Sequence, residues 1–425
     1  MFSFIDHLST PVVYLTQSLW RDEAFSYVLS KNSVFNIVIF TSQDFNPPLY
    51  YLLLHFWMKL IGNSEVSMRS LSFIFHILTC YVVYKLTKRV FDGKNGTLAF
   101  LLTFFNPMLL YFSFEARMYS LLALLAVSSM YFFYLKKWRL WFFVSCFGVY
   151  THLFFWFTIL SQITISFIIK DWKKYLLRFA LLLLIFTPWV PFVLIQIFKG
   201  NQGFWVNKID LQLVLSSLGN ILTSYEGTPG GLWNFTAFVS FGLLILSFDI
   251  LKKRRDLFTK LNIVWLYVPL FTIITISLWK PLFVNRYLIF LTIPMIFMMI
   301  IVIDIYKKIG KLIFLAILFF EISVFLYLGP YYRKVDIREV IRKINMQTKI
   351  GDVIVSKTPI TYFETNYYSS FRSFLYAPDK NRIPTYVGKA LINESKIVPD
   401  FSLFKYKVFL INDDGTVEVL KPPFM

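Results

Sequence analysis

The chain has 425 residues, of which 57% are hydrophobic and 20% aromatic, and its formal net charge is +19 at pH 7. This apolar load excludes a soluble domain and indicates a polytopic membrane protein. The positive charge does not indicate a nucleic-acid partner, because the basic residues form short clusters between apolar runs, as cytoplasmic loops do.

The N-terminal residues 1–20 are too short and too polar for a membrane span, which needs roughly 20 apolar residues. They are followed by Arg21-Asp22-Glu23-Ala24, two adjacent carboxylates at the end of an aromatic segment. An acidic pair at a membrane edge is a candidate functional site. The alternative is that both carboxylates cap a helix beginning near Ala24.

The next segment ends in Asp44-Phe45-Asn46-Pro47-Pro48. The double proline blocks a helix before it and suits a helix start at Pro47 or Pro48. Residues 49–61 are apolar but too few to span, so we predict a helix lying in the membrane interface. Residues 21–65 are therefore expected to form the first outer loop, with juxtamembrane helices.

About ten spans are predicted from runs of apolar residues. The run 140–169 is interrupted by Tyr150-Thr151-His152 and is interpreted as two short helices joined outside. The predicted spans are 66–84, 97–113, 118–135, 140–151, 153–169, 177–197, 233–250, 261–279, 284–305 and 312–329.

Five basic loops orient these spans. They contain Lys85, Lys88, Arg89 and Lys94; Lys136, Lys137 and Arg139; Lys170, Lys173, Lys174 and Arg178; Lys252, Lys253, Arg254 and Arg255; and Lys307, Lys308 and Lys311. All five fall on one side, which the positive-inside rule makes cytoplasmic. We therefore predict a multi-pass protein of the plasma membrane. Its extracytoplasmic segments would be residues 21–65, 113–117, 151–152, 198–232, 280–284 and everything after 330.

The tail, residues 331–425, has short alternating segments instead of long apolar runs. An amphipathic helix is predicted around 336–341, strands at 353–355, 406–411 and 416–420, and a hairpin turn at Asn412-Asp413-Asp414-Gly415. We therefore expect a transmembrane catalytic domain over 1–330 and a small extracytoplasmic α/β domain over 331–425.

Ionisable residues gather on the predicted outer face. Glu115 and Arg117 share a loop too short to leave the membrane surface, where they form either an interfacial ion pair of little energetic value or part of a cavity. Lys280 and Arg286 flank a span and either snorkel or contact lipid phosphate. A metal held by His55 and His152 with Asp22 or Glu115 is an alternative that the spacing does not support.

Five stretches recur in an order and spacing that can be compared with a known family. They are Asp22-Glu23-Ala24, Asp44-Phe45-Asn46-Pro47-Pro48-Leu49-Tyr50-Tyr51-Leu52-Leu53-Leu54-His55, Arg69, Phe114-Glu115-Ala116-Arg117-Met118-Tyr119-Ser120-Leu121 and Asn285-Arg286-Tyr287. Together they resemble the bacterial branch of the GT-C membrane glycosyltransferases, in glycosyltransferase family 39, related to the protein O-mannosyltransferases and the lipid A aminoarabinose transferase. The resemblance covers roughly residues 20–300 and departs from the family at Asn46, where many relatives have His.

The resemblance implies an all-α GT-C fold and a polyprenyl-phosphate sugar donor used on the extracytoplasmic face, with Asp22 as general base. We accordingly predict three groups of site residues. They are catalytic Asp22, Glu23 and Glu115; donor-phosphate-binding Arg117, Arg286 and Lys280; and acceptor- or sugar-binding Asp44, Asn46, His55 and Tyr119.

The chemistry is consistent with these residue types, because sugar transfer from a lipid phosphate needs a base for the acceptor hydroxyl and cations for the departing phosphate. The sequence requires no cofactor, leaves a divalent metal open and does not define the oligomeric state. The competing hypothesis is a transporter or flippase of lipid-linked sugars. Transporters tend to contain internal repeats and charges buried within spans, and the sequence has no clear repeat.

Overall fold

The structure is a computed structural model that describes residues 3–199, 206, 208–226, 231–384 and 387–420. Residues 200–205, 207 and 227–230 of the predicted outer loop 198–232 lie outside this description. Contacts divide the chain into two units. The first contains Met1–Pro11, Arg69–Pro188 and Trp205–Tyr332, and the second contains Val12–Met68, Trp189–Phe204 and Arg333–Met425. Each unit is described by itself.

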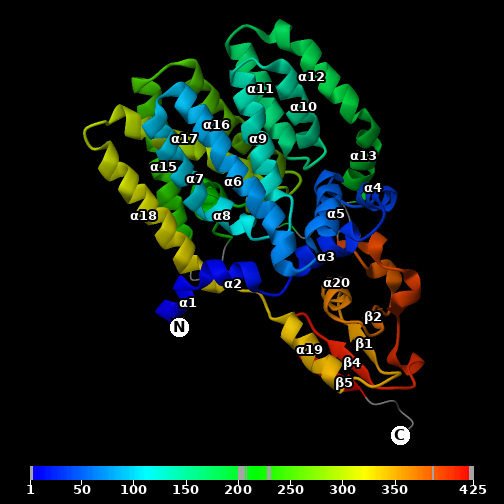
Figure 1. Ribbon diagram of the computed structural model, residues 1–425. Coiled ribbons are helices and arrows are strands. Elements are labelled where there is room, and N and C mark those ends of the chain that lie inside the picture. Colours follow the sequence, from blue (N-terminus) through cyan, green and yellow to red (C-terminus); the bar gives the residue numbers. More distant parts are fainter. Residues whose placement is uncertain (1–2, 200–205, 207, 227–230, 385–386, 421–425) are drawn as a thin grey trace. The chain divides into compact units, whose positions relative to one another are not determined.

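The first unit is built from helices (Figure 1). They are α1 (Phe4–Leu8), α6 (Glu65–Val90, from Arg69 onward), α7 (Gly93–Phe105), α8 (Pro107–Ser113), α9 (Tyr119–Tyr134), α10 (Trp138–Val149), α11 (Phe155–Ile168), α12 (Trp172–Phe186), α14 (Leu211–Thr223), α15 (Trp233–Lys253), α16 (Leu257–Ser277), η2 (Asn285–Leu291), α17 (Thr292–Ile305), α18 (Gly310–Leu328) and η3 (Gly329–Tyr332).

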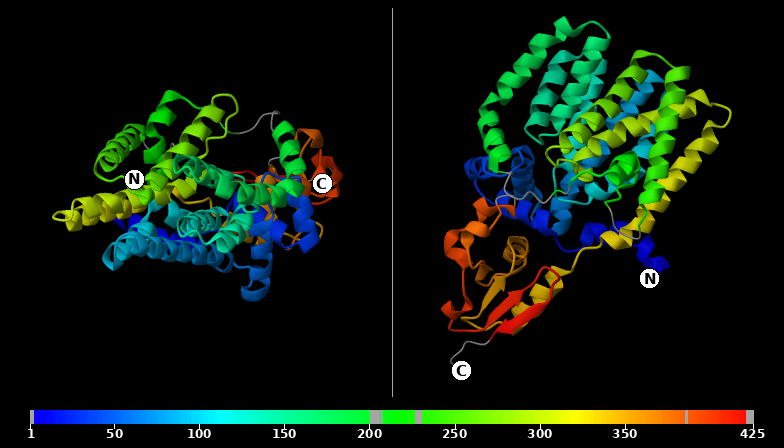
Figure 2. Two further views of the ribbon diagram at one scale, coloured as in Figure 1. Left: turned by 90° about the horizontal axis from the view of Figure 1, so that it is seen from above. Right: turned by 180° about the vertical axis from the view of Figure 1, so that it is seen from behind.

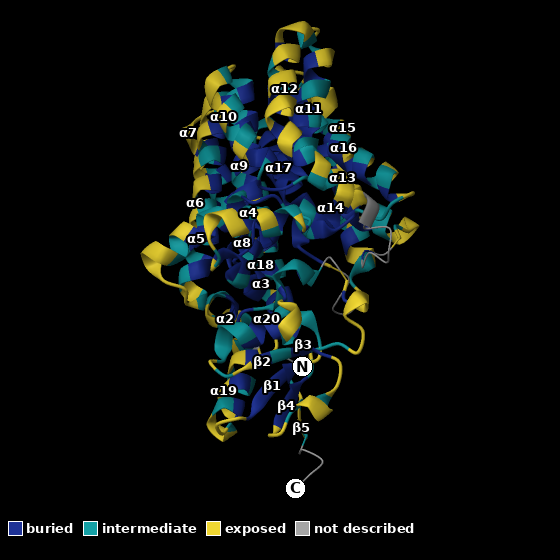
Figure 3. Ribbon diagram, turned by 90° about the vertical axis from the view of Figure 1, so that its right-hand side faces the viewer, coloured by how far each residue is buried: buried dark blue, intermediate teal, exposed yellow. Residues whose placement is uncertain are grey.

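Helix α17 forms the core of this unit. Its residues from Thr292 to Ile303 are all buried, and α7, α15, α16 and α18 pack against it (Figure 3). A helix that is apolar on every face is stable only when it is surrounded by other helices or lipid. In contrast, α12 exposes leucines along much of its length, as a lipid-facing helix does.

The predicted all-helical membrane architecture with a small α/β tail is confirmed. Among the described residues, six helical segments are long and apolar enough to cross a membrane, or seven if the bent pair α7–α8 forms one span. Helices α9, α10 and α11 match predicted spans but, at 10–17 residues, are shorter than these six segments. The helix predicted over 49–61 is also present.

Two features of the bundle differ from the prediction. The segment 97–113 bends by 60° between α7 and α8, because Pro107 lacks an N–H and Asn106 caps α8 by accepting a hydrogen bond from the Leu109 N–H at 3.2 Å. Helix α14 lies within the stretch assigned to an outer loop. It packs so closely on α15 that a Cβ at Gly219 would lie 2.0 Å from the Thr236 carbonyl oxygen.

The second unit combines short helices with the tail. Its helices are α2 (Thr10–Thr16, from Val12 onward), α3 (Arg21–Ser30), α4 (Val34–Ser42), α5 (Leu49–Ile61), α13 (Val190–Lys199), α19 (Ile337–Gln347) and α20 (Pro359–Tyr368), and its strands are β1 (Val353–Ser356), β2 (Ser373–Tyr376), β3 (Ile397–Val398), β4 (Val408–Ile411) and β5 (Val417–Leu420). Helix α3 starts earlier than the start predicted near Ala24, so Asp22 and Glu23 lie within its first turn.

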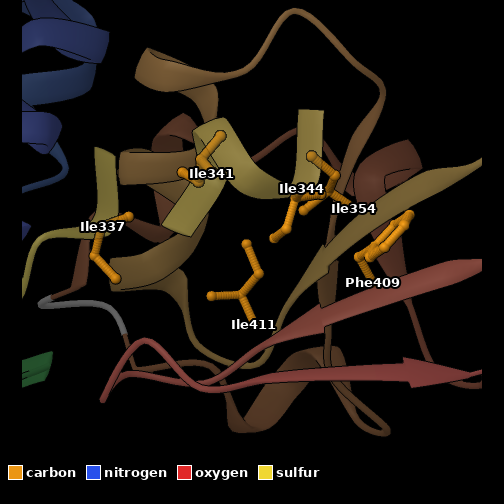
Figure 4. Close-up of a cluster of buried hydrophobic side chains, with 6 residues drawn as sticks. All are labelled: Ile337, Ile341, Ile344, Ile354, Phe409 and Ile411. Carbon is orange, nitrogen blue, oxygen red and sulfur yellow. The ribbon is translucent and has the colours of Figure 1, made fainter. Parts of the chain in front are cut away.

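The five strands form one sheet in the order β3-β2-β1-β4-β5, in which only the β4–β5 pair is antiparallel. The red strands β4 and β5 lie side by side in the right-hand view of Figure 2. Alternate residues of β1 and β4 face opposite sides. Ile354, Phe409 and Ile411 pack against Ile341 and Ile344 of α19 (Figure 4). The sequence predicted α19, β1 and the β4–β5 hairpin but not α20, β2 or β3.

Candidate active site

The acidic pair lies at the start of α3 in the second unit. Asp22 is half-buried and Glu23 is fully buried. The Glu23 carboxylate accepts a hydrogen bond from the Trp20 N–H at 3.2 Å, which stabilises the first turn of the helix. The capping alternative therefore applies to Glu23, whose carboxylate contacts the backbone at the helix start.

Glu23 also pairs with a lysine from the tail. The Lys334 Nζ atom lies 3.2 Å from Glu23 Oε2, and the two side chains are 4% and 0% exposed. The same ammonium lies 5.3 Å from the centroid of the Trp20 ring. A buried ion pair of this kind holds both partners, because separating them leaves a desolvated charge.

Two further hydrogen bonds connect the start of α3 to helix α20. The Arg21 N–H donates to Glu364 Oε1 at 2.9 Å, and the Leu19 N–H donates to the Tyr368 hydroxyl at 2.6 Å. Burial raises the pKa of Glu364 to about 7. These tail residues lie more than 300 positions from α3, and no local pattern in the sequence marks them as its partners.

The predicted acceptor- or sugar-binding residues of the second unit lie on and before α5. Asp44 is buried and its carbonyl accepts a hydrogen bond from the Gln196 amide of α13, whereas Asn46 is half-buried. The His55 Nδ1–H donates to the Ser30 carbonyl at 2.8 Å. His55 and Ser30 also line a cavity of about 350 Å³ together with Lys31, Met58, Lys59, Gly62 and Asn63.

An arginine cluster lies in the first unit. The Arg286 Nε–H donates to the Tyr119 hydroxyl at 3.1 Å, and the Arg117 guanidinium lies 5.8 Å from the centroid of the Tyr119 ring. Glu226 is the acidic neighbour of Arg286, with 3.6 Å between Oε2 and Nη1. Such a long and partly exposed pair is weak. The structure thus brings together Arg117, Tyr119 and Arg286.

Glu115 and Arg117 do not lie at an open surface. Their residues are 3% and 6% exposed, and the Arg117 N–H donates to the Glu115 carbonyl at 2.8 Å within the turn before α9. Lys280 is half-buried in the segment after α16. Of the two interpretations of this short loop, the burial favours a site inside the protein over an interfacial ion pair.

The backbone around Arg286 is held by its neighbours. The Asn285 amide donates to the Tyr225 carbonyl at 2.6 Å, and the Tyr287 ring lies 5.0 Å from His152 and 5.2 Å from Phe154. A guanidinium group on a fixed backbone loses less conformational entropy when it binds an anion. The sequence predicts His152 in a turn between two short helices, either as a structural hydrogen-bonding group or as a metal ligand.

Within the described part of the chain, no three His, Cys, Asp or Glu side chains gather in a way that would hold a metal ion. The metal alternative stays a prediction.

Comparisons with known proteins agree with this architecture. The model of the family described as dolichyl-phosphate-mannose-protein mannosyltransferase matches residues 46–194. The crystal structure of apo ArnT from Cupriavidus metallidurans is similar, with a TM-score of 0.63 and 11% identity, covering 95% of this chain and 91% of that one. ArnT bound to undecaprenyl phosphate gives a TM-score of 0.61 and 10% identity, covering 96% and 91%. No curated protein matches the sequence.

The fold is therefore that of the GT-C membrane glycosyltransferases, and the resemblance seen in the sequence motifs is confirmed. The ArnT fold and the long apolar helices support a multi-pass membrane protein. The family match contains Glu115, Arg117 and Tyr119 but begins after Asp22 and ends before Arg286.

Proposed function

We propose that this protein transfers a sugar from a polyprenyl-phosphate donor to a hydroxyl acceptor on the extracytoplasmic face of the membrane. The observation that carries the proposal is the arginine cluster, in which Arg117 and Arg286 both contact Tyr119 in a partly dehydrated site. Arginine is well suited to such a site because its planar fork pairs with phosphate oxygens. ArnT, which has the same fold, has been crystallised with undecaprenyl phosphate.

In the proposed reaction the acceptor oxygen attacks the anomeric carbon of the sugar. The bond between that carbon and the phosphate oxygen breaks, and the polyprenyl phosphate leaves with the bonding electrons. Asp22 accepts the acceptor proton, while Arg117 and Arg286, with Lys280 as a third cation, stabilise the charge that develops on the phosphate.

The remaining predicted residues have supporting roles in this proposal. Glu23 fixes the helix that carries Asp22, and Glu115 is the second candidate base. Asp44, Asn46, His55 and Tyr119 would contact the sugar or the acceptor, and His55 is supported by the cavity that it lines.

The direct test is incubation of the purified protein with a panel of radiolabelled polyprenyl-phosphate sugars and membrane extracts. Release of free polyprenyl phosphate together with label in a new product would establish transfer. If no donor in the panel is cleaved but labelled lipid moves between leaflets of vesicles, the transporter hypothesis replaces this one.

Replacing Arg286 with Ala is expected to weaken donor binding by roughly 10- to 100-fold, because a hydrogen bond to a charged group contributes about 1.5–3 kcal/mol. The measurement is titration of the protein with a polyprenyl-phosphate sugar. Arg382→Ala is the control, since the Arg382 side chain is 89% exposed in the tail. Unchanged affinity and turnover for Arg286→Ala would leave this arginine as an interfacial anchor only.

The tail, residues 331–425, is expected outside the cytoplasm, because the five basic loops define the other side. A reporter that is active only in the cytoplasm should give no signal when fused to the C-terminus, and should be active when fused after Lys253. A strong signal from the C-terminal fusion would contradict the proposed orientation and the proposed face of reaction.

One observation bears on the transporter hypothesis. Glu321 is a fully buried carboxylate within α18, and such residues in spans mark transport pathways in many proteins. Here Glu321 Oε1 accepts a hydrogen bond from the Asn106 amide at 3.3 Å, at the bend between α7 and α8. Its contact with a helix cap favours a structural role in this bend.

A further inference from the structure

His152 has an unusual environment for a buried histidine. It lies in the turn between α10 and α11, and its ring contacts Tyr287 at 5.0 Å, Phe154 at 5.4 Å and Tyr119 at 6.3 Å between centroids. Tyr119 and Tyr287 belong to the segments that carry Arg117 and Arg286. The imidazole is therefore held by aromatic packing beside the arginine cluster.

The protonation of the ring follows from its contacts. The Phe154 backbone N–H donates to His152 Nδ1 at 3.1 Å, so Nδ1 is an acceptor and the neutral ring carries its proton on Nε2. Burial, and then the positive charges of Arg117 and Arg286, lower the pKa of His152 to about 3. The ring is thus a neutral N–H donor at physiological pH.

The donor at Nε2 is unused. His152 Nε2 is buried and has no hydrogen-bond partner in the described structure. A buried donor without an acceptor is unfavourable, and the ring that carries it contacts Tyr119 and Tyr287, which belong to the segments of Arg117 and Arg286. An acceptor that also carries negative charge would satisfy the imidazole N–H and would be attracted by the two guanidinium groups.

We propose that His152 is a further ligand of the donor phosphate, donating its Nε2–H to a phosphate oxygen beside Arg117 and Arg286. This inference rests on the proposed function and adds a residue to that site. A neutral donor suits the position, because burial and the two nearby arginines disfavour a positive charge on the imidazole. The aromatic packing orients the N–H before the ligand arrives, so little reorganisation is needed when negative charge develops on the leaving phosphate.

The test uses undecaprenyl phosphate as the probe and the full-length protein in detergent. His152→Phe keeps a planar ring in the aromatic cluster but removes the donor, and we expect it to weaken binding by roughly 10- to 100-fold. His152→Gln supplies an amide N–H and should recover part of this loss. A thermal unfolding scan confirms that each variant is folded.

The pH dependence separates a neutral donor from a cation. The affinity of the wild type is divided by that of His152→Phe at each pH. The ionisation of the phosphate and the charges of Arg117, Arg286, Glu115 and Glu226 affect both proteins alike, so they do not change this ratio. We expect the same ratio at pH 6 and pH 8. A ratio that falls steeply between these values would mean that His152 binds as an imidazolium and would overturn the proposal.

The outcomes distinguish this inference from the proposed function. If Arg286→Ala weakens binding but folded His152→Phe and His152→Gln bind as wild type, His152 has only a packing role. If Arg286→Ala also binds as wild type, the phosphate site itself is misplaced. Loss of affinity in His152→Phe with partial recovery in His152→Gln supports the proposal.

Discussion

Asp22→Asn is expected to lower turnover by about 10²–10⁴-fold while donor binding is largely kept, because a positioned general base contributes a factor of that size. Asparagine preserves the shape of the side chain but cannot accept the acceptor proton. Asp22 is half-buried in the first turn of α3, so the substitution should leave the fold intact. The measurement is the rate of polyprenyl phosphate release at saturating donor, together with donor affinity.

Glu23→Gln is the matched comparison, because it changes the adjacent carboxylate in the same way. It should lower stability more than Asp22→Asn, since it removes the charge facing Lys334, and it should reduce turnover less. If Asp22→Asn turns over normally while Glu115→Gln is inactive, the base has been assigned to the wrong carboxylate. If neither matters in folded protein, the transferase proposal fails.

Lys334→Met should destabilise the second unit by about 3–5 kcal/mol, the cost typical of removing one partner from a buried ion pair. Methionine fills a similar volume, so the effect comes from leaving the Glu23 carboxylate without this ammonium rather than from a cavity. At roughly 2–4 °C for each kcal/mol, the apparent melting temperature should fall on the order of 10 °C. Thermal unfolding of the detergent-solubilised protein measures this shift.

Two variants show whether the buried pair is responsible. Lys343→Met removes a lysine of the same tail whose side chain is 65% exposed and 3.8 Å from Glu339, and it should change the melting temperature little. The double variant Glu23→Gln, Lys334→Met removes both charges and should recover most of the loss. A double variant as unstable as Lys334→Met alone would mean that the pair is not the cause.

Helix α14 shows why some helices are not predicted from the sequence. Its small and polar residues, among them Ser216, Ser217, Gly219 and Asn220, resemble a loop composition. In the structure the Gly219 N–H donates to the Ser240 hydroxyl at 2.8 Å, and the absence of a side chain lets α15 approach. The same residues that lower the hydropathy of α14 allow its close packing, which only the partner helix reveals.

The sequence by itself determined the membrane class, most of the spans, the tail hairpin and the motifs around Asp22, Arg117 and Arg286. These features depend on apolar run length, charge placement and turn residues, which act within a few neighbouring positions. Only the tertiary structure decided that Lys334 and Glu364 hold the start of α3, and that His152 presents an unpaired donor beside Arg117 and Arg286. Lys334 and Glu23 are 311 positions apart. Whether such groups meet depends on how the helices and the sheet pack. An ion pair, or a buried donor without an acceptor, is decided by the residues that surround it in the fold and not by its neighbours in the sequence.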